Sequence, residues 1–100
     1  MEDGVPAVTR IGDDDTPHCS GMVRLEGSTD TFCNGIGISR QGDVNTGHEL
    51  PGVPCPSHSA PITVGSTTVF VNGKGCGRVG DAISGCTAVA VGSTDTFAGG

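Results

Sequence analysis

The side chains best suited to chemistry in this sequence are three histidines and five cysteines. Imidazole and thiolate groups bind zinc, and a structural zinc site holds four of them in a tetrahedron, at about 2.0 to 2.3 Å from the ion. His18, His48 and Cys86 each follow an arginine by eight residues, and His58 is the remaining histidine. We therefore predict a closed site made by His18, His48, His58 and Cys86. It would hold one zinc or iron ion, because these ligands suit both metals.

Two neighbouring cysteines compete with this assignment. Cys19 adjoins His18, and Cys55 precedes His58 by three residues, so either cysteine could replace its neighbour as a ligand. Adjacent side chains of an extended chain point to opposite sides, so His18 and Cys19 should not both bind. We favour His18 because it keeps the shared spacing. Cys33 and Cys76 are interpreted as small buried apolar residues, which is common for free cysteine.

The spacing of the ligands follows an internal repeat. The pattern Arg-x-Gly-Asp occurs three times, at 10–13, 40–43 and 78–81, and uses three of the four arginines. A Gly-Ser-Thr segment that ends in phenylalanine also occurs three times, at 27–32, 65–70 and 92–97. A repeat of this kind decides the whole fold. Three similar units would bring one ligand each to a pseudo-threefold axis, at the apex of a cone.

The first two units also carry signals for a hairpin. Asn34-Gly35 and Asn72-Gly73 follow the first two Gly-Ser-Thr segments, and Asn-Gly favours a two-residue type I′ turn. The segment 67–71 is rich in β-branched and aromatic residues, as strands are. We predict a unit made of a Gly-Ser-Thr strand, a turn, a returning strand that ends near Arg-x-Gly-Asp, and a ligand-bearing loop.

The composition indicates a small all-β fold that needs reinforcement. One hundred residues fit a single domain, residues 1–100. Leu, Ile, Val and Phe number only 21, with no Trp or Tyr, while 18 glycines and 6 prolines exclude long helices. Structural zinc contributes on the order of 10 kcal/mol, similar to the whole stability of a small domain. A metal ion would therefore compensate for the small core.

Charge and patterning exclude several classes of protein. A net charge of −6 argues against binding nucleic acid, which requires clustered Lys and Arg. No stretch approaches the 18 to 20 apolar residues of a membrane span, and residues 1–9 lack the features of a signal peptide. We expect a soluble chain that is not exported by its own signal. An odd number of cysteines without a secretory signal argues against a disulfide framework.

Three of these features together resemble a known family. They are the segment 6–10 (Pro-Ala-Val-Thr-Arg), the repeated Arg-x-Gly-Asp, and the run Gly-Ser-Thr-Thr-Val-Phe-Val-Asn-Gly-Lys at 65–74. The chain is similar to PAAR-repeat proteins over nearly its full length. The Pro-Ala-Ala-Arg element itself is degraded, to Gly-Ile-Ser-Arg at 37–40 and Gly-Cys-Gly-Arg at 75–78.

The resemblance implies a small conical β-structure with a metal near its point. Its broad base would sit on the end of a trimeric β-helical spike, with one copy per trimer, in a contractile phage tail or a type VI secretion system. We expect a chain made in the cytoplasm and delivered outside the cell at the tip of the assembled apparatus. The tip would contact the target envelope, and its surface could also bind effector cargo. The segments that end at Phe32, Phe70 and Phe97 are the candidates for the base.

We therefore expect a structural protein and not an enzyme. The alternatives are a zinc-dependent hydrolase and a small stand-alone metal-binding module. A hydrolase would need an open coordination position and a general base. The acidic run 13–15 could be imagined in that role, but such runs are usually solvated loops.

Overall fold

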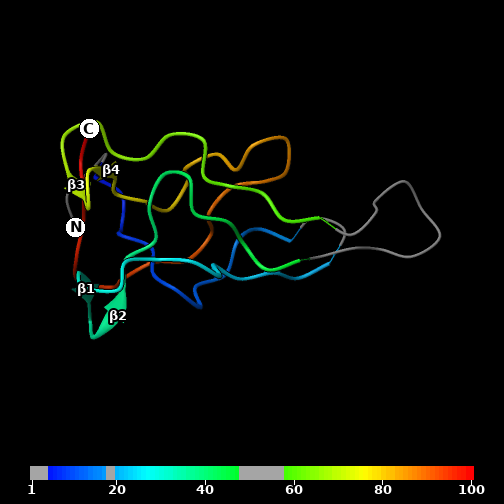
Figure 1. The fold of residues 1–100 in the computed structure, drawn as a ribbon, viewed down its shortest axis with the longest axis horizontal. Helices are drawn as coiled ribbons and strands as arrows, with labels where there is room; N and C mark the ends of the chain where they lie inside the picture. The colour runs from blue at the N-terminus through cyan, green and yellow to red at the C-terminus, as the bar shows by residue number, and fades with distance from the viewer. Residues whose placement is uncertain (1–4, 18–19, 48–57) are drawn as a thin grey trace.

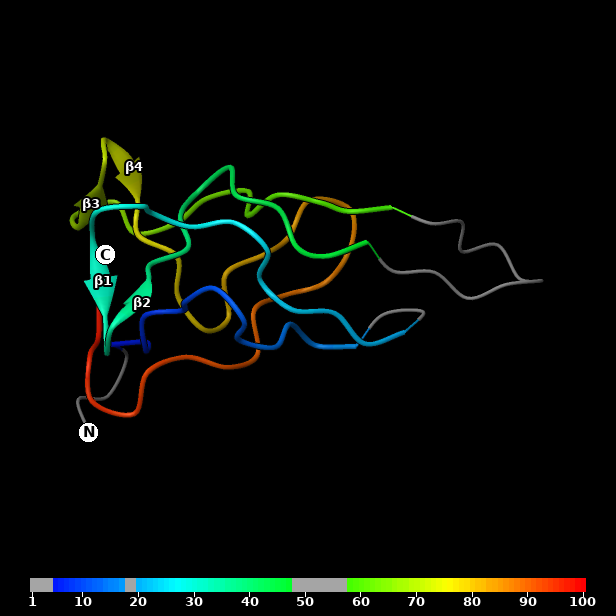
Figure 2. The same cartoon turned by 60° about the horizontal axis from the view of Figure 1, so that its bottom comes forward.

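The computed structural model describes residues 5–17, 20–47 and 58–100. Its four strands form two antiparallel hairpins, β1 (Phe32–Cys33) with β2 (Ile36–Gly37), and β3 (Phe70–Val71) with β4 (Lys74–Gly75). The described ranges contain no helix, so the expectation of an all-β fold is confirmed at that level. Both hairpins lie at the same end of the molecule (Figures 1 and 2).

The hairpin turns have the predicted conformation. Asn34 and Gly35 have φ angles of 56° and 76°, and Asn72 and Gly73 have 55° and 77°. Positive φ at both central residues defines a type I′ turn, which matches the twist of the flanking strands. The Asn-Gly prediction is confirmed in both copies.

The Gly-Ser-Thr segments differ from their prediction, because they are serine-centred turns and not strands. The Ser28 Oγ accepts hydrogen bonds from the backbone N–H groups of Asp30 and Thr31, at 3.2 and 2.9 Å. Ser66 and Ser93 make the equivalent pairs of bonds. A serine hydroxyl that captures nearby N–H groups competes with strand pairing. The strands β1 and β3 therefore begin only at Phe32 and Phe70, the last residues of the first two segments.

A third hairpin-like pairing joins the two ends of the described chain. Ala7 and Phe97 form an antiparallel bridge, and the N–H of Ala98 donates to the carbonyl of Pro6 at 3.0 Å. Gly100 has a φ of 83°, as the glycines of the two Asn-Gly turns do. The first and last parts of the chain thus complete the third unit between them, and this closes the chain into a ring.

At the centre of this ring, three backbone hydrogen bonds run in a circle. The N–H of Thr9 donates to Gly77 at 3.0 Å, that of Gly77 to Ser39 at 2.9 Å, and that of Ser39 to Thr9 at 3.1 Å. All three residues are buried, and each directly precedes the arginine of its unit. The circle marks the pseudo-threefold axis predicted from the repeat.

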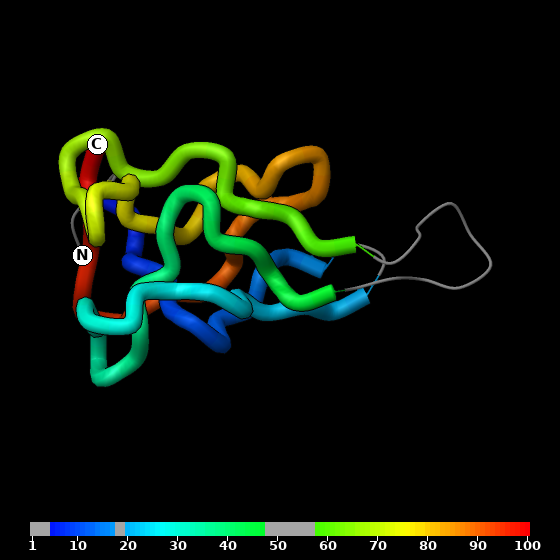
Figure 3. The backbone as a smooth tube through the Cα atoms, viewed as in Figure 1, coloured from blue at the N-terminus to red at the C-terminus, as the bar shows by residue number. Residues whose placement is uncertain are grey.

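Beyond the circle, six extended segments pair in a second closed circuit. Each unit contributes an outgoing and a returning segment, and each returning segment also pairs with the next unit. The bridges are Asp14↔Val23, Arg24↔Asn45, Val44↔Pro61, Ile62↔Ile83, Ala82↔Ala88 and Val89↔Asp15. The described parts of the outgoing segments lead away from the hairpin end (Figure 3). Of the links between outgoing and returning segments, 84–87 is described completely, whereas 16–22 and 46–60 include residues outside the described ranges.

The Arg-x-Gly-Asp motif forms the same turn in all three units. Its glycines, Gly12, Gly42 and Gly80, have φ angles of 90°, 91° and 92°, as the third position of a type II turn requires. The arginine and aspartate of each motif form an ion pair, at 2.8, 2.8 and 2.9 Å. The motif is therefore a turn closed by its own charged side chains.

These arginines also connect the turns to the hairpins. The Arg10 Nη1 donates to the Asn34 Oδ1 at 2.8 Å, and Arg40 makes the same bond to Asn72 at 2.9 Å. In the third unit Arg78 donates instead to the carbonyl of Gly99 at 3.0 Å. The arginine at the same place in each unit thus bonds an Asn-Gly turn in two cases and Gly99 in the third.

The buried apolar residues form two small clusters along the axis. The hairpin-end cluster contains Cys33 and Cys76, so their predicted burial is confirmed; its other members are Val8, Ile38, Val71 and Ala98. The second cluster lies in the circuit of six segments and consists of Ala60, Ile62, Ile83 and Val89, with Val79 and Cys86 packed against it. Neither cluster contains a large aromatic side chain, as the composition predicts.

The central circle yields a stability prediction. A Cβ atom added at Gly77 would lie 2.6 Å from the Ser39 carbonyl oxygen, whereas one added at Gly21 meets nothing within 4 Å. We expect Gly77→Ala to lower the free energy of unfolding by about 1 to 3 kcal/mol, the usual cost of overpacking. Gly21→Ala is the matched control and should leave stability nearly unchanged. Denaturation midpoints of the two variants check this, and equal midpoints would contradict the close packing at the axis.

Candidate metal centre

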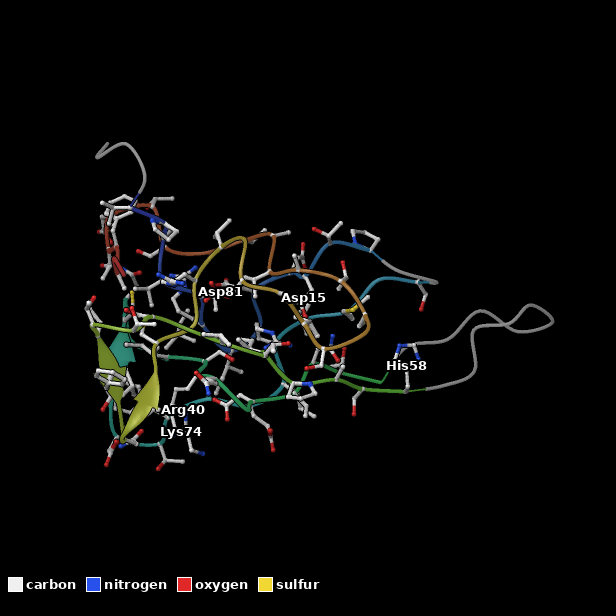
Figure 4. The ribbon with its side chains drawn as sticks, turned by 90° about the horizontal axis from the view of Figure 1, so that it is seen from above. Asp15, Arg40, His58, Lys74 and Asp81 are labelled. Carbon is white, nitrogen blue, oxygen red and sulfur yellow. The ribbon has the colours of Figure 1, made fainter. Side chains whose placement is uncertain are left out.

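Two of the four predicted metal ligands lie in the described ranges, and the fold brings them together. The His58 Nε2 is 3.7 Å from the Cys86 Sγ. The two residues are 28 positions apart and belong to different units of the repeat. His18 and His48 lie outside the described residues, as do the rival ligands Cys19 and Cys55. Figure 4 places His58 toward the end of the molecule opposite Lys74 of β4.

The separation of these two atoms suits a shared ion. With bonds of about 2.3 Å to sulfur and 2.0 to 2.1 Å to nitrogen, a tetrahedral angle puts the two ligand atoms about 3.6 Å apart. The same separation fits a hydrogen bond between a thiol and an imidazole. His58 and Cys86 are both half-buried, which is compatible with a closed structural site. Within the described ranges no group of three or more His, Cys, Asp or Glu side chains is placed to hold an ion.

Cys86 is held in a tight link between two segments of the circuit. The N–H of Cys86 donates to the Ile83 carbonyl at 2.9 Å, and the N–H of Ile83 donates to the Thr87 carbonyl at 2.8 Å. Gly85 has a φ of 61°, which glycine adopts without strain. This link places the sulfur against the second apolar cluster, and burial raises the pKa of the Cys86 thiol. The polar side chain of Asn45 acts in the opposite direction and lowers that pKa.

A buried polar network lies next to this site. Arg24 and Asp15 are 0% and 1% exposed, and the Arg24 Nη2 lies 3.0 Å from the Asp15 Oδ2. The Asn45 Nδ2 donates to the same carboxylate oxygen at 3.1 Å, and the Arg24 Nη1 donates to the Asp43 carbonyl at 3.2 Å. Figure 4 shows Asp15 between the hairpin end and His58. The ion pair is therefore an internal feature of the fold between its two ends.

This network was not predicted from the sequence, although the repeat contained a signal for it. Asp15, Asn45 and Ile83 each follow the arginine of their unit by five residues, so they occupy equivalent places. Arg24 is the one arginine outside the Arg-x-Gly-Asp motifs. The first two units thus carry a polar residue, Asp15 or Asn45, where the third unit carries the apolar Ile83. The threefold repeat does not require a polar side chain at this position, so the two polar residues indicate a local role.

Comparison with models of known protein families gives no match, and comparison with curated protein sequences gives none either. Among the described residues there is no helix long and apolar enough to span a membrane.

The pairing of His58 with Cys86 leads to a prediction about metal content. If the pair forms half of the predicted site, the purified chain carries about one zinc or iron ion, and Cys86→Ala loses most of it because a thiolate ligand is gone. Cys33→Ala is the matched control, since the structure puts Ala98 at the equivalent place in the third unit. Elemental analysis of the three proteins provides the measurement. Equal metal in Cys86→Ala and the parent chain would rule out Cys86 as a ligand.

Proposed function

We propose that this chain is the structural tip of a contractile injection machine, a metal-pinned cap on the end of a trimeric β-helical spike. The observation that carries the proposal is the closed pseudo-threefold ring, in which one chain repeats the same turn and ion pair three times. A single chain with three similar faces can dock along the axis of a threefold partner, as no ordinary monomer can. The resemblance to PAAR-repeat proteins supplies the identity of that partner.

The hairpin end has the properties of a docking surface for this partner. Phe32 of β1 and Phe70 of β3 are 57% and 60% exposed, and Ile36 of β2 is 38% exposed. Large apolar side chains that stay exposed in equivalent hairpins indicate a surface that another protein covers. A standard interface takes about 800 Å² from each partner, which is about one sixth of this chain's accessible surface of 4987 Å². One end of the molecule would supply that area.

Polar groups next to the hairpin turns would set the orientation of the cap on the spike. The Asp30 Oδ1 accepts a hydrogen bond from the Asn72 Nδ2 at 2.8 Å, and Asp95 accepts one from Asn34 at 3.0 Å. These bonds lower the pKa of both carboxyl groups, so both carry charge at neutral pH. The exposed phenylalanines are thus accompanied by fixed carboxylates next to the hairpin turns. An apolar centre with a polar rim is the usual composition of a specific interface.

The metal would act at the other end of the molecule, where it would fix the links between the segments of the circuit. His58 and Cys86 come from different units, so an ion bound to both would join these units directly. The chemistry that such an ion supplies is structural ligation, and His18 and His48 would complete its ligand set. The proposed role is a rigid point that contacts the target envelope while the opposite end holds the spike.

This function predicts a defined complex. Mixed with the trimeric spike protein of its own machine, the chain should bind with one copy per trimer, because the two threefold axes coincide. Replacement of Phe32 and Phe70 by aspartate should abolish the complex and leave the metal content unchanged. Leu25→Asp is the matched control, since Leu25 is 54% exposed but lies outside the hairpins.

Light scattering during gel filtration measures the mass of each complex. Three caps per trimer, or a double variant that binds like the parent chain, would contradict this mode of docking. A parent chain that binds no spike at all would favour a stand-alone metal-binding module.

A further inference from the structure

The first unit carries three exposed apolar side chains next to one another on its outer surface. They are Ile11, Leu25 and Phe32, with exposed fractions of 39%, 54% and 57%, and we call them the flank stripe. A Cβ atom added at Gly27 would lie 2.7 Å from the Ile11 Cγ1, and one added at Gly37 would lie 3.1 Å from the Ile11 Cδ1. The Ile11 side chain therefore lies against both glycines.

The backbone places the other two members beside Ile11. Phe32 of β1 pairs with Gly37 of β2, and paired residues of antiparallel strands point to the same face. The N–H of Gly12, the residue after Ile11, donates to the carbonyl of the residue before Leu25 at 2.9 Å. The flank stripe thus leads from the hairpin end along the side of the first unit.

The equivalent side chains of the other two units do not form such a stripe. In the second unit they are Gln41, Thr63 and Phe70, and in the third they are Val79, Ala90 and Phe97. The Gln41 Oε1 accepts a hydrogen bond from the N–H of Gly65 at 3.3 Å, so a polar amide interrupts the apolar surface of the second unit. In the third unit Val79 and Phe97 are only half-buried, but the residue at the place of Leu25 is a small alanine.

A surface that occurs once does not suit a threefold partner. A symmetric trimer presents the same surface to all three units, so a contact made for it would recur in each of them. The flank stripe departs from the repeat in this respect. It therefore indicates a different partner, which binds the side of the molecule in a single copy.

Acidic side chains next to the stripe determine the chemistry of that partner. Asp14 pairs with the residue two positions before Leu25, and Glu26 directly follows Leu25; both acids are exposed. The arginine beside Ile11, Arg10, already forms an ion pair with Asp13. The residues at the places of the two exposed acids in the other units are all apolar: Val44, Ala82, Val64 and Val91. The acids and the stripe thus occur together in one unit, and a cationic partner complements them.

We propose that the flank stripe binds one protein partner through a segment that combines apolar side chains with lysine or arginine. Ile11 and Leu25 would be covered by the apolar side chains, while Asp14 and Glu26 would face the cations, as in interfaces with an apolar centre and a polar rim. A second copy of this chain would bring like charges together, which disfavours it as the occupant. The inference goes beyond the docking of the hairpin end and does not depend on it.

The experiment titrates the ¹⁵N-labelled full chain with the capped peptide Leu-Lys-Leu-Lys-Leu and follows the amide signals by NMR. We expect the signals of residues 11–14 and 23–26 to shift. The test variant combines Ile11→Gln with Leu25→Thr, which gives the first unit the side chains that the second unit carries at the same places, so it should fold. Its affinity for the peptide should fall about tenfold, because two exposed aliphatic side chains are no longer there to be buried.

Two further measurements serve as controls for the apolar and the charged contributions. Val64→Thr removes an aliphatic side chain that is 53% exposed on the second unit, and it should bind the peptide like the parent chain. A peptide with glutamate in place of lysine should leave the amide signals of the parent chain unshifted, because Asp14 and Glu26 repel it.

Three results would overturn the proposal. They are a parent chain whose signals the lysine peptide does not shift, a test variant that binds it like the parent, and a Val64→Thr variant that loses as much affinity as the test variant. Sedimentation of the parent chain alone covers the remaining occupant. A dimer that is lost in the test variant would assign the stripe to a second copy and would overturn the choice of a cationic partner.

Discussion

The circle of backbone hydrogen bonds among Thr9, Ser39 and Gly77 is the constraint on which the rest of the structure depends. It brings three segments of the chain together around one axis at the position before each Arg-x-Gly-Asp turn. The approach is so close that the third position has room only for glycine, since a Cβ atom at Gly77 would meet the Ser39 carbonyl oxygen at 2.6 Å. From this circle the hairpins extend to one end, and His58 lies toward the other (Figure 4).

A closed ring has consequences for stability in a chain with so small a core. The third unit is assembled from both ends of the described chain, so hydrogen bonds between distant residues, such as Ala98 to Pro6, close the structure. The Arg-x-Gly-Asp turn and its ion pair occur three times, and in each case the arginine also bonds a second segment, at Asn34, Asn72 or Gly99. The circuit of six segments likewise pairs each segment on both sides, which leaves no open strand edge at these bridges. The repeated hydrogen bonds and ion pairs thus contribute stability to a fold whose composition supplies little apolar surface to bury.

Much of this arrangement could be predicted from the sequence because the repeat carries it. The Asn-Gly turns, the pseudo-threefold axis and the burial of Cys33 and Cys76 follow from residue types at equivalent positions. The repeat register selected Cys86 as a ligand and His58 was added as the remaining histidine, and the structure brings these two side chains to 3.7 Å. The Gly-Ser-Thr segments were predicted wrongly, because the same serine that marks the repeat also bends the backbone around its hydroxyl. The network of Asp15, Arg24 and Asn45 was not predicted, because its polar residues depart from the threefold pattern, which has Ile83 at the equivalent place in the third unit.

We propose that this threefold-closed chain brings ligands from all three units to a single metal ion at the end opposite the hairpins. Anomalous X-ray diffraction from crystals of the purified chain, recorded at the zinc and iron absorption edges, tests it most directly. The account predicts one strong peak about 2.0 to 2.3 Å from the His58 Nε2 and the Cys86 Sγ, with His18 and His48 completing the tetrahedron. A chain without such a peak, or with a peak bound by other residues, would contradict the account.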